Sequence, residues 1–154
     1  MARAPITTHH LYGQPGNEYE VFLPFAETLV KTPHRSGYKL HVTVSTQHHE
    51  QLASVILPTL RLLHTHHKVV LPGCYERFNS GLQAGKFITV YAGPDRPARR
   101  IVETLDPVLM RLRQKGIQPG PTPKNRQLNH AQAEEYVGIS KMLTWLWLDN
   151  LTRG

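Results

Sequence analysis

The stretch Tyr38-Lys39-Leu40-His41-Val42-Thr43-Val44 decides the fold, because apolar and polar residues alternate along it. Residues that alternate in this way lie on opposite faces of a β-strand. One face of this strand is therefore apolar and faces a core, while the other carries Lys39, His41 and Thr43. Lys39 and His41 start about 7 Å apart on that face, so their side chains can reach one ligand.

The segments on both sides of this strand show further strand and helix patterns. Short apolar runs predict strands within residues 18–25, 67–71 and 86–91. Apolar residues at three- and four-residue spacing predict helices over about residues 47–64 and 97–116, and from residue 136 to the end. A turn of helix is expected at residues 26–29, and residues 74–84 are expected to be irregular. Together these elements predict an α+β fold with a short, mainly antiparallel sheet flanked by helices.

The length and composition predict one compact domain. A chain of 154 residues with 40% hydrophobic residues can bury a single core. Residues 1–17 are rich in proline and glycine and are expected to form a flexible leader, with residues 18–154 as the domain. No apolar stretch reaches the length of a signal peptide or a membrane span. We therefore expect no membrane partner, and a protein that is cytoplasmic or exported without a signal peptide.

The charge balance favours an anionic partner. Eighteen Lys and Arg against eleven Asp and Glu give a net charge of +7. Six of these cations could form a basic face on the second predicted helix: Arg96, Arg99, Arg100, Arg111, Arg113 and Lys115. Stacking aromatics do not interleave with them, which disfavours single-stranded nucleic acid as the partner.

Metal and disulfide chemistry are not expected. The single cysteine, Cys74, excludes an internal disulfide and the multi-cysteine metal patterns. The histidine pairs His9-His10 and His48-His49, and the run from His64 to His67, lack the companion ligands of a structural zinc site. The sequence therefore predicts neither a metal nor a cofactor.

An ordered set of motifs extends over roughly residues 38–128. It comprises Lys39-Leu40-His41, Lys68 at the start of the next strand, the stretch Gly85-Lys86-Phe87-Ile88-Thr89-Val90-Tyr91, and Arg126 after a proline-rich turn. This set resembles the bacterial phosphothreonine lyases, which include secreted effectors acting on host kinases. It is also similar to the lyase domain of class III and IV lanthionine synthetases. The resemblance implies a lyase-like fold and a metal-free β-elimination, in which phosphate leaves phosphothreonine or phosphoserine and a dehydroamino acid remains.

The resemblance also implies roles for individual residues. Lys68 matches the general base that removes the α-proton, His41 the general acid that protonates the departing phosphate oxygen, and Lys39 a residue that assists the substrate's charge. The remaining substrate and phosphate contacts fall to Arg126, Tyr91, Lys86 and Arg77, the last at a spacing that differs from the effectors. The implied partner is a phosphorylated protein or peptide, either a host kinase or a biosynthetic precursor. The sequence gives no indication of the oligomeric state.

Elementary chemistry makes these roles coherent. A lysine acts as a base only when neutral, and nearby cations such as Lys39 and Arg126 disfavour the charged form of Lys68. His41 has the opposite requirement, because a phosphate dianion beside it favours the imidazolium. The planar fork of Arg126 suits bidentate binding of phosphate.

Two other interpretations stay open. The same fold without turnover would be a phosphopeptide- or anion-binding module, and the basic surface leaves an RNA binder in this class. The stretch His41-Val42-Thr43 also fits the His-x-Thr element of two-histidine phosphoesterases, which carry a second such element on a neighbouring strand. The best candidate for that second element is Phe87-Ile88-Thr89, which has phenylalanine where histidine is required.

Overall fold

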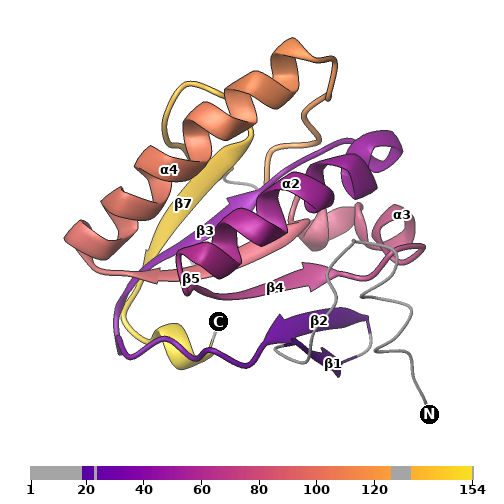
Figure 1. Cartoon of the computed structure of the whole chain (residues 1–154). Coiled ribbons are helices and arrows are strands. Elements are labelled where there is room, and N and C mark those ends of the chain that lie inside the picture. Colours follow the sequence, from indigo (N-terminus) through magenta and orange to yellow (C-terminus); the bar gives the residue numbers. More distant parts are fainter. Residues whose placement is uncertain (1–18, 23, 126–132, 154) are drawn as a thin grey trace.

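An antiparallel sheet of seven strands forms the centre of the molecule (Figure 1). The structure is a computed structural model that describes residues 19–22, 24–125 and 133–153. The strand order is β1-β2-β4-β5-β3-β7-β6, and every neighbouring pair is antiparallel. The strands are β1 (Tyr19–Phe22), β2 (Phe25–Thr28), β3 (Gly37–Val42), β4 (His66–Val70), β5 (Ile88–Gly93), β6 (Glu135–Tyr136) and β7 (Leu143–Leu148). The predicted α+β class with a mainly antiparallel sheet is thus confirmed.

Two long helices cover one face of this sheet. They are α2 (His49–Leu62) and α4 (Asp95–Gln114), which lie against each other on the same side (Figure 1). The short helix α3 (Tyr75–Phe78) and three 3-10 turns, η1 (Thr46–His48), η2 (Gly81–Gln83) and η3 (Leu151–Arg153), complete the described elements. Within these residues, no helix combines the length and the apolar character that crossing a bilayer requires.

The core lies between the sheet and these helices. The alternation predicted for the central strand is confirmed, since Leu40 and Val42 are fully buried. The helices contribute stripes at three- and four-residue spacing, including Leu52, Ile56, Leu60, Leu105 and Leu109, all fully buried. Each such side chain contributes roughly 1.5–3 kcal/mol to folding. Core packing therefore fixes which face of β3 is left for polar residues.

The C-terminal segment corrects one expectation. A helix was predicted from residue 136, but β6 and β7 form there instead. Ile139 was part of the helical pattern, yet it is 72% exposed. The run over Leu143–Leu148 pairs along its whole length with β3, and Trp145 stacks on Tyr38 with ring centroids 4.2 Å apart. Aromatic and large apolar residues suit such a strand, because it has neighbours on both faces.

The helical turn expected at residues 26–29 is also absent. Residues Phe25–Thr28 form β2, which pairs with β1 in a hairpin and with β4 on its other side. Ala26 and Thr28 are buried, while Glu27 points to the opposite face. Residues 74–84, expected to be irregular, contain the short turns α3 and η2. The predicted leader, residues 1–17, lies outside the described residues.

Candidate active site

A row of polar residues crosses the centre of the sheet on the face opposite α2 and α4. His41 in β3 pairs with Thr89 in β5, and Thr89 pairs with Lys68 in β4. On its other side His41 pairs with Thr144 in β7. Residues paired across antiparallel strands share a face, and strands lie about 4.8 Å apart. The Cα atoms of Lys68 and His41 are therefore about 10 Å apart, with one strand between them.

A second row lies two residues along the strands. Lys39 pairs with Tyr91, and Tyr91 pairs with His66. This row is about 7 Å from the first. Burial raises the pKa of Tyr91, with a smaller contribution from the charge of Glu27, so its hydroxyl stays protonated and can donate a hydrogen bond.

The fold therefore places four of the seven predicted site residues on one face: Lys39, His41, Lys68 and Tyr91. Lys86, just before β5, also belongs to this site. It is only 8% exposed, and its charge acts on both His41 and Glu134.

The other two predicted residues are not part of this group. Arg77 lies exposed on α3, where it donates a hydrogen bond to Sγ of Cys74 at 3.4 Å. No contact within the described residues joins Arg77 to the two rows. Arg126 lies outside the described residues, so its predicted phosphate contact stays a prediction.

Glu134 is a site residue that the sequence did not reveal. Its Oε1 is 2.8 Å from Nδ1 of His41 and also accepts a hydrogen bond from Oγ1 of Thr144 at 2.8 Å. The side chains of His41 and Glu134 are 3% and 1% exposed. Ninety-three residues separate them in the sequence, so no local motif could have joined them. Nδ1 of His41 therefore carries a proton and donates it in a hydrogen bond to the Glu134 carboxylate. This leaves Nε2 to exchange a proton with a ligand.

Charge and burial oppose each other in this pair. Burial lowers the pKa of the His41 imidazole; the hydrogen bond and charge of Glu134 counteract this, and the cations Lys39 and Lys86 add to the lowering. Burial by itself would raise the pKa of Glu134, but the hydrogen bonds from His41 and Thr144 and the charge of Lys86 lower that pKa overall. Near neutral pH the pair is thus a carboxylate beside a neutral imidazole, and an anion placed beside the ring would favour the imidazolium.

Lys68 contacts an aromatic ring. Its Nζ lies 4.7 Å from the ring centroid of Phe25 in β2. The face of an aromatic ring attracts a cation and so favours the ammonium form. Binding of an anion suits this form, whereas abstraction of a proton requires the neutral amine.

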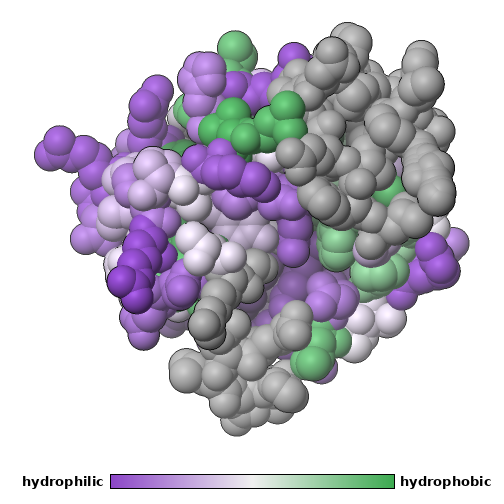
Figure 2. All heavy atoms as spheres, turned by 90° about the horizontal axis from the view of Figure 1, so that it is seen from below, coloured by the Kyte–Doolittle hydropathy of each residue, from purple (hydrophilic) through white to green (hydrophobic). Residues whose placement is uncertain are grey.

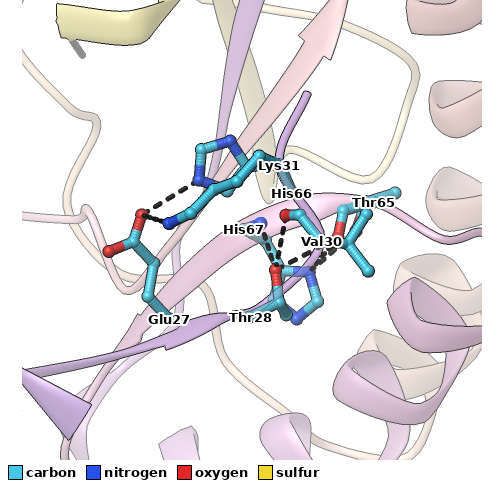
Figure 3. Close-up of polar contacts among 7 residues, drawn as sticks. All are labelled: Glu27, Thr28, Val30, Lys31, Thr65, His66 and His67. Carbon is cyan, nitrogen blue, oxygen red and sulfur yellow. Dashed lines mark hydrogen bonds and ion pairs between the residues drawn. The ribbon is translucent and has the colours of Figure 1, made fainter. Parts of the chain in front are cut away.

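A polar cluster continues these rows where β2 and β4 meet, since it includes His66 of the second row and Glu27, which pairs with Lys68 (Figure 3). Nε2 of His66 is 2.9 Å from Oε1 of Glu27, and Nζ of Lys31 is 3.4 Å from the same oxygen. Behind them, Nδ1 of the fully buried His67 lies 2.7 Å from Oγ1 of Thr65. Burial lowers the pKa of His67 to about 3. His67 is therefore an uncharged structural residue at neutral pH.

Within the described residues, no group of three or more His, Cys, Asp or Glu side chains is placed to hold a metal ion. Seen from below in Figure 2, the described part of the surface is largely hydrophilic, with apolar residues in small separate patches.

Comparison of the chain with models of known protein families and with curated proteins finds no match.

Proposed function

We propose that the protein is a phosphothreonine or phosphoserine lyase that acts on a phosphorylated protein or peptide. One observation carries the proposal: the base and acid candidates, Lys68 and His41, lie in one cross-strand row with Lys39 beside them. A base and an acid that flank one strand can reach opposite ends of the Cα–Cβ–O unit of a phosphorylated side chain.

The proposed reaction is an elimination. The neutral Nζ of Lys68 takes the α-proton, and the electron pair of the C–H bond becomes the Cα=Cβ double bond. The Cβ–O bond breaks, and Nε2 of His41 gives its proton to the departing phosphate oxygen. The charges of Lys39 and Lys86 stabilise the phosphate as it leaves. The products are a dehydroamino acid and inorganic phosphate, and no step is assigned to a metal.

Glu134 acts in this scheme through His41. Its carboxylate holds Nδ1 and so fixes the ring orientation and the tautomer, as carboxylates do in other acid–base pairs. It also stabilises the imidazolium that must form when the substrate phosphate arrives. Glu134 is a positioning residue, because Nε2 rather than the carboxylate meets the substrate.

A phosphopeptide-binding module without turnover is the second candidate. The contact of Lys68 with the Phe25 ring favours it, since a charged lysine grips phosphate but removes no proton. The two-histidine phosphoesterase is less well supported. Phe87, at the position of the required second histidine, is 1% exposed and packs in the core against Tyr75.

Mass spectrometry of phosphopeptides separates these functions. Synthetic phosphothreonine and phosphoserine peptides are incubated with the full chain, with and without EDTA. Elimination leaves a peptide lighter by one water than the product of hydrolysis, and it is expected to persist in EDTA. Hydrolysis products, or activity that requires added metal, would contradict the lyase. Saturable binding of the peptides without any mass change would assign the binding module instead.

A further inference from the structure

A cavity lies at the end of the sheet where β4 begins and β5 ends. Its volume is about 230 Å³. Three segments form its walls: residues 30–34 after β2, residues 63–66 leading into β4, and the first turns of α4 at residues 97–101. Tyr91 and Ala92 of β5 complete the lining. We call this cavity the β4–α4 cleft; of the predicted lyase residues, only Tyr91 lines it.

The titratable side chains of the β4–α4 cleft are strongly biased towards positive charge. Apart from Tyr91 they are all cations or imidazoles: Lys31, His34, His64, His66 and Arg100. No carboxylate is among the lining residues. Glu27 lies outside the lining, and its carboxylate contacts both Lys31 and His66. The cleft also lies beside the start of the 20-residue helix α4, whose N-terminal end carries partial positive charge.

His66 provides an independent indication of a ligand. Its side chain is 10% exposed, and its ring lies 4.4 Å from that of Tyr91. Nε2 is held by Glu27, as Figure 3 shows, where Lys31 converges on the same carboxylate. Nδ1 is buried, and among the residues that the structure describes it has no hydrogen-bond partner. A buried polar atom left without a partner is costly, so such atoms commonly face a water or a ligand.

Because Nε2–H of His66 donates its hydrogen bond to Glu27, Nδ1 of the neutral ring is an acceptor, and protonation of the ring turns it into a donor. Burial lowers the pKa of His66, the hydrogen bond to Glu27 raises it, and the charges of Lys31 and Lys68 lower it. A negative group beside the ring would favour the imidazolium, whose Nδ1–H then has an acceptor. The cavity volume of about 230 Å³ accommodates a carboxylate or phosphate group.

We infer that the β4–α4 cleft binds a small oxyanion through Lys31, Arg100 and His66. The ligand class is the oxyanion itself, supplied either as a carboxylate or as a phosphate group. This site goes beyond the proposed lyase function and does not rest on it, because Tyr91 is the one predicted lyase residue in its lining and is not among the three residues proposed to bind the anion.

The test is an NMR titration of the full chain with sodium phosphate and, in a separate arm, sodium acetate. The ring signals of His66 report on the β4–α4 cleft, and those of His41 report on the lyase site. A saturable shift of His66 is expected with at least one anion, and the arm that produces it identifies the phosphate or the carboxylate as the ligand group. Absence of a saturable His66 shift in both arms overturns the inference, whatever His41 does.

Two arginines on the same helix provide the matched variants. Arg100→Gln removes a lining cation and is expected to weaken the anion affinity measured at His66 about tenfold or more, without changing the response of His41. Arg99→Gln removes an equally exposed cation that is not part of the lining, and is expected to leave both responses unchanged. Equal weakening by the two variants would show diffuse screening instead of a site and would contradict the inference. Both positions are exposed, so neither change is expected to impair folding.

Discussion

Glu134 shows how one carboxylate can decide the behaviour of the whole site. In Glu134→Gln the hydrogen-bonding shape is kept, but the charge that raises the pKa of His41 is lost. We expect a lower His41 pKa by NMR and a fall in kcat of about a hundredfold, with KM nearly unchanged, because Glu134 does not meet the substrate. Glu135→Gln, at the exposed neighbouring position, is the control. An unchanged His41 pKa in Glu134→Gln would refute the positioning role.

Lys68 and Arg126 separate catalysis from binding. Lys68→Ala is expected to slow elimination about a hundredfold or more while leaving phosphopeptide affinity nearly intact, because the base acts on the α-proton. Arg126→Ala would remove the phosphate contact predicted for this residue, so affinity and turnover should fall together, by about 2 kcal/mol in binding. Calorimetry and single-turnover kinetics measure the two effects. Equal losses of affinity in both variants, with no elimination in the wild type, would favour the binding module.

His67 makes the stability of the fold dependent on pH. Its pKa is about 3 in the folded state, against an ordinary value of 6.5. Between these values the unfolded chain binds a proton that the folded chain does not, so stability is lost as the pH falls from 6.5 towards 3. The contribution is up to about 1.4 kcal/mol per pH unit. We expect the free energy of unfolding, measured by denaturant titration at several pH values, to depend less steeply on pH in His67→Gln than in the wild type. His64→Asn, at an exposed histidine, should keep the wild-type pH dependence. Identical slopes for His67→Gln and wild type would contradict this assignment.

At the scale of elements, side chains of α4 hold the loop before β7 by hydrogen bonds. Asp106 in α4 accepts hydrogen bonds from the backbone N–H groups of Ile139 and Ser140. Gly138 has a φ of +79°, and a Cβ atom there would lie 2.3 Å from the Asp106 carboxyl carbon. This contact positions the chain for its pairing with β3.

Gly138→Ala is therefore expected to be costly. Backbone strain and the clash together should destabilise the fold by about 2–3 kcal/mol or more, which lowers Tm by several degrees. Gly73→Ala is the matched control, because Gly73 has a φ of +81° with nothing within 4 Å. It carries the strain without the clash and should cost about 1–2 kcal/mol. Thermal unfolding followed by circular dichroism compares the two variants. An equal fall in Tm would contradict the contribution of the Asp106 contact to stability.

The same elements show what the sequence could and could not predict. The alternation around His41 was sufficient to predict β3 and the face shared by Lys39 and His41, because strand period is a local property. The C-terminal helix was wrong, since apolar residues spaced as in a helix also suit a strand that is covered on both sides by its neighbours. Trp145 finds its stacking partner in Tyr38, more than a hundred residues earlier in the chain. Glu134 was missed for the same reason: its partner is brought to it only by the completed sheet.

At the scale of the whole molecule, the two polar rows lie on the inner strands. The row of Lys68, Thr89 and His41 occupies β4, β5 and β3, while β1 and β6 form the edges of the sheet. Edge strands of four and two residues have few neighbours to hold them. The backbone of these edge strands is expected to open locally at a small cost in free energy. The backbone of the inner strands is expected to open only when the whole domain unfolds.

Amide hydrogen exchange gives this arrangement a measurable consequence. The backbone N–H groups of β3 and β5 should exchange with solvent deuterium only through global unfolding, and those of β1 much sooner. Slower amide exchange in β1 than in β3 would contradict the expectation that the edge strands open first. Because the polar rows rest on the slowest-exchanging strands, partial fraying of the molecule leaves their spacing intact. Fraying of the edge strand β6 would, however, release Glu134, which directly precedes that strand, so heat inactivation should precede the melting of the whole domain.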